Sequence, residues 1–325
     1  MYQTPIRLHF SEEQRRRHKL RNLLHSALLI GGMAAILAAC GYALWGGEGV
    51  WWALGAGAFA FLLSPSIPPE LVMRLYGAQP LQPRDLPELF EVVTELARRA
   101  HLPAMPRIYW VPSGILNAFA VGRPDHAAIA VTDGLLRSLT LRELAGVLAH
   151  EISHIRNNDL WLMQLADVMS RLTSLMSYFG QFLFLINLPL LLVGKATVSW
   201  MLVFLLVFAP TIMALLQLAL SRAREFDADL DAAALTGDPQ GLASALAKLE
   251  RLQGRFWEEI LFPGRRMPEP SLLRTHPPTE ERIRRLLSLY EAEPVAPLPP
   301  SRLQLPGHLP PVAPRPRFRR YGFWY

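Results

Sequence analysis

The chain has 325 residues, of which 51% are hydrophobic and only 18% are Asp, Glu, Lys or Arg, and its formal net charge is +6. Soluble proteins contain about 25% charged residues, so this composition argues against an ordinary soluble protein and allows a soluble domain combined with membrane segments. The single cysteine, Cys40, excludes an internal disulfide and a thiolate zinc site. Any metal site must therefore use His and carboxylate ligands.

Four apolar segments have about the 20 residues needed to cross a bilayer. They are residues 22–45, 49–73, 172–194 and 196–221. The first is too long for the apolar part of a cleaved signal peptide, and the second follows at once, so we interpret it as a retained span. The second stops spanning near Leu63, because prolines and Glu70 crowd its end. The alternative for the last two segments is a buried soluble hairpin, but both are long and nearly uncharged.

The positive charges gather on one side of these segments. Six Lys or Arg residues precede the first segment, ten lie between the second and third, and sixteen follow the fourth, whereas the two short loops contain only Lys195. By the positive-inside rule, both termini and almost all the soluble mass are cytoplasmic. This topology accounts for the basic net charge, so we expect the lipid bilayer as a partner and no nucleic acid.

The expected organisation follows from this topology. Residues 1–21 form a basic cytoplasmic N-terminus, residues 22–73 and 172–221 form two membrane hairpins, and residues 74–171 and 222–290 form two parts of one soluble domain. Residues 291–325 contain nine prolines and are expected to form a tail without a packed core.

The soluble parts combine helical and strand patterns. Helical spacing of apolar residues marks residues 85–100, and strand-like runs are residues 107–111, 116–122 and 126–131. Thr140 and Glu143 form a capping box that opens a helix, and further helical stretches lie near residues 223–235, 239–253 and 278–290. We predict a fold that is mainly α with a small β-sheet.

The helix that begins after Thr140 contains the sequence H-E-I-S-H at residues 150–154. Residues i and i+4 share one face of a helix, so His150 and His154 can offer both imidazoles to one ion. Catalytic zinc takes three protein ligands and leaves a fourth position for water, and Glu151 could take a proton from that water. The helix also carries charged residues, which separates it from a membrane span. Short motifs of this kind also arise by chance, so the pattern needs context.

The H-E-I-S-H motif lacks a third ligand. Position 160, six residues after His154, is Leu160. The best candidate is Glu225, because Glu225 and Asp229 share a helix face, so that one could bind Zn²⁺ while the other holds a ligand histidine. The alternative for this E-x-x-x-D pattern is a solvated helix face. Two imidazoles and one carboxylate suit a single Zn²⁺.

Five sequence elements together resemble the HtpX family of membrane zinc metalloproteases, which are relatives of the CAAX prenyl proteases. They are R-L-Y-G-A-Q (74–79), N-A-F-A-V-G (117–122), L-A-H-E-I-S-H-I-R-N-N-D (148–159), S-R-A-R-E-F-D-A-D (221–229) and T-H-P-P-T-E-E-R-I (275–283). The resemblance implies a multi-span α-helical membrane protein with a gluzincin-like zinc protease domain. It also implies that His150, His154 and Glu225 bind zinc and that Glu151 is the general base.

The same resemblance implies a substrate-binding strand and two further polar groups. Asn117, Ala118, Phe119 and Ala120 resemble the edge strand that gluzincins place above the cleft, where a substrate backbone pairs with it. His276 is a candidate donor to the developing oxyanion, and Arg222 is a candidate partner of Asp229 or of another carboxylate of the site. The alternatives are an ordinary sheet strand for the first and a turn-stabilising role for His276.

We therefore expect a membrane-anchored zinc endopeptidase that hydrolyses misfolded or exposed segments of membrane proteins and unfolded polypeptides. It would act in protein quality control at the cytoplasmic face of the inner membrane of a prokaryote. Four spans are too few for the chamber of the CAAX proteases, so prenylated substrates are not expected. A non-enzymatic scaffold or sensor is the main alternative, although such a protein would often have lost Glu151 or a ligand. A transporter is a weaker one, because the apolar segments contain no charged residue apart from Glu70.

Overall fold

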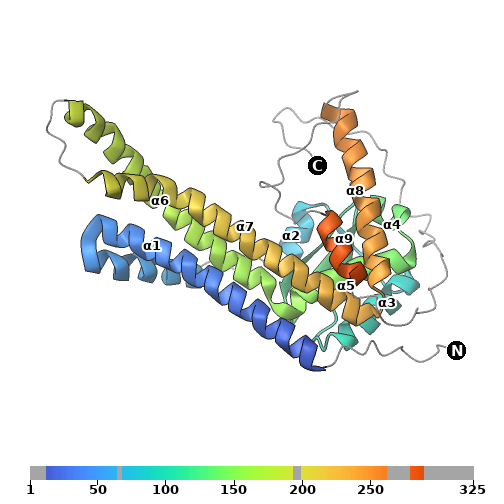
Figure 1. Cartoon of the computed structure of the whole chain (residues 1–325). Helices are drawn as coiled ribbons and strands as arrows, with labels where there is room; N and C mark the ends of the chain where they lie inside the picture. The colour runs from blue at the N-terminus through green and yellow to red at the C-terminus, as the bar shows by residue number, and fades with distance from the viewer. Residues whose placement is uncertain (1–11, 64–67, 193–198, 262–278, 289–325) are drawn as a thin grey trace. The chain divides into compact units, whose positions relative to one another are not determined.

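The computed structural model describes residues 12–63, 68–192, 199–261 and 279–288 (Figure 1). These residues form two compact units. The described residues within Ile67–Leu160 and Glu225–Tyr325 form the first, which we call the mixed unit, and those within Phe10–Ser66 and Trp161–Arg224 form the second, which we call the helical unit. The predicted tail at residues 291–325 lies outside the described residues.

The helical unit contains three long helices, which lie side by side as a bundle in Figure 1. α1 (Glu12–Leu63) belongs to it, together with most of α6 (Asp159–Leu192) and of α7 (Trp200–Thr236). α1 is two helical legs joined at a kink, where Gly46 has φ of +62°, a conformation that glycine adopts without a steric penalty. The legs pack closely, since a Cβ atom on Gly49 would overlap the carbonyl oxygen of Gly41. A hairpin therefore replaces what would otherwise be one helix.

Two stretches of the described residues are long and apolar enough to cross a membrane, Leu23–Leu63 and Trp200–Thr236. Only 22% of each apolar window is buried, which is unlike the core helix of a soluble protein. The first stretch contains nearly all of the first predicted segment and the part of the second up to Leu63, on either side of the kink. The described part of the third predicted segment, residues 172–192, forms the second half of α6 and is not among these two stretches. The arrangement of four spans stays a prediction.

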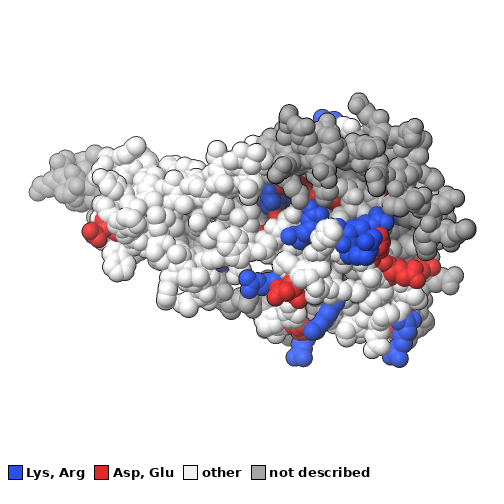
Figure 2. Space-filling view, turned by 90° about the horizontal axis from the view of Figure 1, so that it is seen from below, with Lys and Arg blue, Asp and Glu red and all other residues white. Residues whose placement is uncertain are grey.

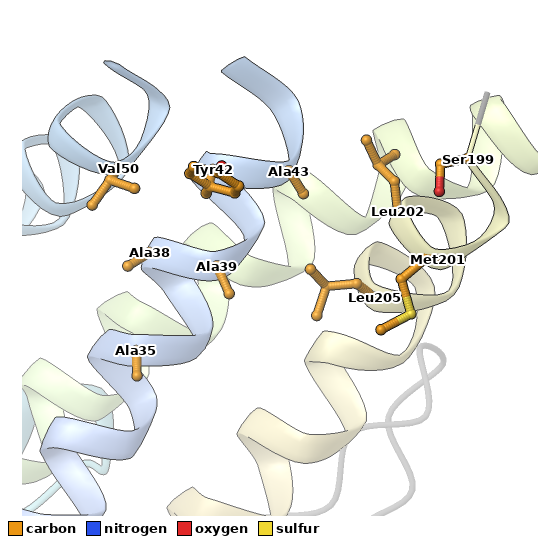
Figure 3. Close-up of a pocket in the computed structure, with 10 residues that line it drawn as sticks. All are labelled: Ala35, Ala38, Ala39, Tyr42, Ala43, Val50, Ser199, Met201, Leu202 and Leu205. Atoms are coloured by element: carbon orange, nitrogen blue, oxygen red, sulfur yellow. The ribbon is translucent and has the colours of Figure 1, made fainter. Parts of the chain in front are cut away.

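The surface of the helical bundle is almost uncharged in the view of Figure 2, whereas acidic and basic side chains crowd the described surface of the mixed unit. The bundle interior is apolar, with Met33, Leu37 and Met213 fully buried or nearly so. A groove lies between α1 and α7 (Figure 3). Alanines at positions 35, 38, 39 and 43 line one side of it, and Met201, Leu202 and Leu205 line the other. Within the bundle, small residues thus leave open space as well as close helix contacts.

The mixed unit is built around a four-stranded sheet with the strand order β1-β2-β4-β3. Its strands are β1 (Gln79–Pro80), β2 (Arg107–Val111), β3 (Ala118–Arg123) and β4 (His126–Thr132). β2 and β4 are parallel, whereas β1 pairs with β2 and β3 pairs with β4 in antiparallel fashion. Among the described residues, β3 is therefore an edge strand.

Helices cover both faces of this sheet because its strands are apolar on both sides. In β4, Ile129 and Val131 join the main core, and Ala128 and Ala130 join a smaller core on the opposite face. The main core includes residues of α3 (Pro87–Arg99), α4 (Asp133–Ser138), α5 (Leu141–Asn157), α8 (Pro239–Leu261) and α9 (Thr279–Ser288). The smaller core contains Met73 of α2 (Pro69–Leu75). Alternation along β3 then directs Ala118 and Ala120 to the α5 face and Phe119 to the α2 face.

The structure confirms a mainly helical fold with a small sheet, and the predicted elements of the soluble parts are present. The capping box is formed by both predicted partners, Thr140 and Glu143. One difference is instructive. The predicted helix at residues 223–235 is the end of α7, continuous with the apolar segment before it, because no helix-breaking residue separates the two. α8 likewise continues to Leu261, beyond the predicted end at residue 253.

Candidate metal centre

The two histidines of the H-E-I-S-H motif are brought together by α5. The capping box fixes the start of this helix, and a buried apolar face that includes Leu144, Leu148 and Ile152 holds it against the core. One helical turn separates the histidines, so their Nε2 atoms lie 3.2 Å apart, with the rings edge to face. Helix geometry alone therefore supplies two of the three candidate ligands.

Glu225 on α7 completes the cluster. Its Oε2 atom lies 3.6 Å from His150 Nε2, and its Oε1 atom lies 3.7 Å from His154 Nε2. Ligands about 2.1 Å from a tetrahedral zinc ion are separated from one another by about 3.4 Å. The three distances of 3.2, 3.6 and 3.7 Å therefore fit one zinc ion, and three protein ligands leave the fourth position open. Within the described chain, His150, His154 and Glu225 thus form a group that could hold a metal ion, because one ligand atom from each lies within 4.8 Å of the other two.

Each histidine is oriented by a carboxylate on its other ring nitrogen. His150 Nδ1 lies 3.0 Å from Asp229 Oδ1, and His154 Nδ1 lies 2.8 Å from Asp159 Oδ2. Such a partner directs the opposite nitrogen toward the metal and makes the ring a better ligand. Asp229 was predicted for this position, but Asp159 was not. The signal was present in the sequence, because Asp159 is the last residue of the N-N-D that follows the motif, and Asn158 turns the chain with φ of +58°.

Arg282 on α9 is a further residue that the sequence analysis did not select. Its guanidinium donates two hydrogen bonds of 2.7 Å to the carboxylate of Asp229, and its Nη1 atom lies 3.2 Å from Glu225 Oε2. Arg282 is only 8% exposed. The sequence did contain a signal for Arg282, because it lies four residues before Leu286 and so shares the apolar face of the helix. A charged residue on such a face must be paired when it is buried. The predicted role of Arg222 at Asp229 stays a prediction, and His276 lies outside the described residues.

Glu151 belongs to α5, and its carboxyl group meets the edge strand β3 at Ala120. Burial raises the pKa of its carboxyl group, although the nearby histidines and a hydrogen bond from the backbone amide of Ala120 oppose this shift. A carboxylate with a raised pKa is closer to the pH at which it can both accept and release a proton. The hydrogen bond also places Ala120, one of the four predicted substrate-binding residues, directly beside Glu151.

The pKa of His154 is raised as well. Burial alone would lower its pKa, but the hydrogen bond with Asp159 and the charges of Glu151, Asp159 and Glu225 raise it to about 9. The cluster thus has a strong excess of negative charge around its imidazoles. A bound cation would relieve that excess.

The edge strand β3 has backbone groups that do not pair with β4. Asn117 and Thr132 form a hydrogen-bonded pair, since Thr132 N donates to Asn117 O at 3.0 Å and Asn117 N donates to Thr132 Oγ1 at 3.0 Å. Hydrogen-bonded and non-hydrogen-bonded pairs alternate along antiparallel strands. Ala118 and Ala120 therefore direct their N–H and C=O groups away from β4. The N–H of Ala120 donates to Glu151, so the groups directed to the edge for pairing are the N–H and C=O of Ala118 and the C=O of Ala120. The strand predicted to bind substrate is open where its middle residues lie.

Residues 83–290 of the sequence match the model of peptidase family M48. The chain is 41% identical over 287 residues to a protease HtpX homolog of Acaryochloris marina, covering 83% of this chain and 95% of that one. A protease HtpX homolog of Methylibium petroleiphilum is 35% identical over 295 residues, with 82% and 98% covered. The crystal structure of S. mikatae Ste24p is similar with a TM-score of 0.44 and 19% identity, covering 86% of this chain and 69% of that one.

Proposed function

Because the chain belongs to peptidase family M48, among the membrane-associated metalloproteases related to HtpX, we propose that it is a zinc endopeptidase. It cleaves exposed or misfolded segments of membrane proteins, and unfolded polypeptides, at the cytoplasmic face of a prokaryotic inner membrane. The observation that carries this proposal is the spacing of His150, His154 and Glu225, whose ligand atoms lie 3.2 to 3.7 Å apart.

The three side chains would hold one Zn²⁺, with Asp229 and Asp159 orienting the two imidazoles. When bound, zinc supplies Lewis acidity toward the substrate carbonyl and acidifies the water beside it. Glu151 accepts the proton of the attacking water and delivers it to the amine that leaves.

Substrate recognition takes place at the edge of β3. An extended polypeptide pairs with the N–H and C=O groups of Ala118 and with the C=O group of Ala120, which brings one of its peptide bonds beside Glu151. Backbone pairing of this kind gives affinity with little dependence on sequence. Such tolerance suits an enzyme that removes damaged proteins of many kinds.

Both sequence and helix order link the site to the predicted membrane segments. Glu225 follows the apolar segment 196–221 by only four residues, and α6 starts at Asp159, which orients His154. The site is thus tied by sequence to both legs of the second predicted hairpin. Basic residues flank the predicted spans on the side of the site, which indicates the cytoplasmic face.

The test is cleavage of casein and of a membrane-protein reporter by the full-length protein, purified in detergent and supplied with zinc. We expect Glu151→Gln to lower kcat/KM by at least about 100-fold, the lower end of what a positioned proton-transfer group contributes. The control is Glu91→Gln, which changes an exposed glutamate of α3. Equal activity of the wild type and Glu151→Gln would sink the mechanism.

A further inference from the structure

The short helix α2 packs against both β4 and the edge strand β3, on the face of the sheet opposite α5. At its start, Pro69 Cγ would be 2.8 Å from a Cβ atom on Gly122 of β3. At its end, the ring of Tyr76 lies 4.8 Å from that of Phe119, also on β3. Seven helical residues extend about 10.5 Å, and three strand residues extend about 10 Å. The two elements therefore run side by side, in opposite directions.

One flank of α2 faces the interior of the sheet. Glu70 Oε1 accepts a hydrogen bond of 2.6 Å from Arg107 Nη1 on β2, and it lies 2.9 Å from His126 Nε2 on β4. Pro69 and Met73 are the buried residues of α2, and Met73 belongs to the smaller core. The flank of α2 that carries Glu70 is therefore the one that lies toward β2 and β4.

The other flank must face the open edge of β3. At about 100° per residue, Val72 lies on the side of the buried stripe opposite Glu70, and Tyr76 follows Val72 by one turn. Tyr76 is 53% exposed and the neighbouring Leu75 is 70% exposed, while Val72 and Phe119 are half-buried. We call Val72, Tyr76 and Phe119 the α2 wall. It is an apolar surface in continuity with the strand predicted to bind substrate.

Strand alternation determines what reaches this wall. A chain that pairs with Ala118 and Ala120 places the residue opposite Phe119 on the same face of the sheet as Phe119. That side chain lies against the Tyr76 ring. Its two neighbours point to the other face, where Glu151 and the histidines lie. An extended substrate therefore presents alternate side chains to the α2 wall and to the metal centre.

We propose that the α2 wall is a specificity surface, which selects a large apolar side chain from the extended substrate segment at the position opposite Phe119. This rests on the proposed function, because it requires a substrate strand on β3. The ligand of this surface is a polypeptide because Phe119, one of its three residues, belongs to β3, the strand with which the substrate backbone pairs. Contact with lipid is the competing use of the same surface, and the experiment separates the two.

The experiment uses internally quenched peptides that differ at one residue, leucine or serine, placed in turn at each position around the cleaved bond. The full-length zinc-loaded protein in detergent should prefer leucine at one position, the one that lies opposite Phe119, and not at the two positions next to it. The preference in kcat/KM should be about tenfold, as expected for one apolar contact in a binding site. Tyr76→Ser should lower kcat/KM for the leucine peptide about tenfold and bring the ratio toward one, and Tyr76→Phe should keep the ratio.

Leu71→Ser is the matched control, because Leu71 is 50% exposed on the same helix and points away from the sheet. It should keep the leucine-to-serine ratio of the wild type. Zinc content and melting temperature, measured for every variant, show whether the fold is retained. An unchanged ratio in Tyr76→Ser would overturn the specificity surface while leaving the protease intact.

Two other outcomes are distinguishable. If Tyr76→Ser lowers cleavage of both peptides equally in liposomes and has no effect in detergent, the wall contacts lipid and the inference is overturned. If the wild type cleaves no peptide, or cleaves no faster than Glu151→Gln, the proposed function fails, and the specificity surface fails with it.

Discussion

The helical unit and the mixed unit bring their helices together with different side chains. In the helical unit, Gly41 and Gly49 let two backbones touch across the α1 hairpin. In the mixed unit, charged pairs join distant helices, including Arg282 with Asp229, Arg156 with Asp231 and Lys248 with Glu143. Small residues suffice where a bundle needs only close packing.

One of these charged pairs lies at the groups that can hold a metal, because Arg282 contacts both Asp229 and Glu225. Buried carboxylates are costly unless each has a partner. The pairs that surround Glu225 and Asp229 thus allow a cluster of acidic groups to exist inside a folded protein. Substitutions of the charged groups at the candidate metal centre should therefore affect metal binding, whereas substitutions inside the helical bundle should affect stability alone.

The largest effect is expected from Glu225→Ala, which removes the ligand contributed by α7. Loss of a partner behind a ligand costs about 10–100-fold in metal affinity, and loss of the ligand itself should cost more. We expect the purified variant to lose its zinc and its peptidase activity together, as measured by elemental analysis and casein cleavage. Glu91→Ala serves as the control. Full zinc content in Glu225→Ala would remove this residue from the site.

A smaller but still large effect is expected from Arg282→Met, which leaves the carboxylates of Asp229 and Glu225 without their buried cation. Breaking a buried ion pair in this way costs about 3–5 kcal/mol. The loss should be greatest after zinc is removed with a chelator, because the metal offsets part of the uncompensated charge. Thermal unfolding with and without chelator measures this difference. Arg284→Met, an exposed position on the same helix, should change little.

Gly49→Val should destabilise the helical unit without affecting the metal. Its Cβ atom would overlap the backbone of Gly41, and overpacking of this kind costs about 1–3 kcal/mol. We expect a lower melting temperature with an unchanged zinc content. The matched control is Gly55→Val, since a Cβ atom there meets nothing within 4 Å. Loss of zinc in Gly49→Val, but not in Gly55→Val, would show that packing in the helical unit does affect metal binding in the mixed unit.

The smallest effect concerns Glu143 and pH. Burial alone would raise the pKa of Glu143, but hydrogen bonds from the Thr140 amide, Lys248 and Ser244 lower it below the ordinary value of 4.5. A lowered pKa contributes stability that is present above pH 4.5 and is lost as the pH falls toward the folded value. We expect Glu143→Gln to cost about 1 kcal/mol at neutral pH.

The difference in melting temperature between the wild type and Glu143→Gln should therefore shrink as the pH falls below about 4.5, the unfolded pKa. Glu91→Gln, on the surface of α3, supplies the baseline for general acid effects. A difference that stays constant down to pH 3 would show that the Glu143 network does not depend on ionisation.

Several elements were predictable because their signals are local. The periodicities of 3.6 and 2 residues marked α3, β2 and β4, and the Thr140–Glu143 capping box marked the start of α5. The i, i+4 spacing placed His150 and His154 on one face, and a second i, i+4 pair identified Glu225 with Asp229. The structure brings His150, His154 and Glu225 together, while the catalytic roles assigned to them stay predictions.

What the sequence alone determined is which residues could bind a metal and which helix faces carry them, because these follow from spacing along the chain. Tertiary structure decided that Asp159 and Arg282 support the site, and that Tyr76 lies against Phe119. It also decided that Ala118 and Ala120 lie on an open strand edge. The physical reason is that these relations join elements distant in the sequence, and their partners are chosen by burial and charge pairing rather than by local periodicity.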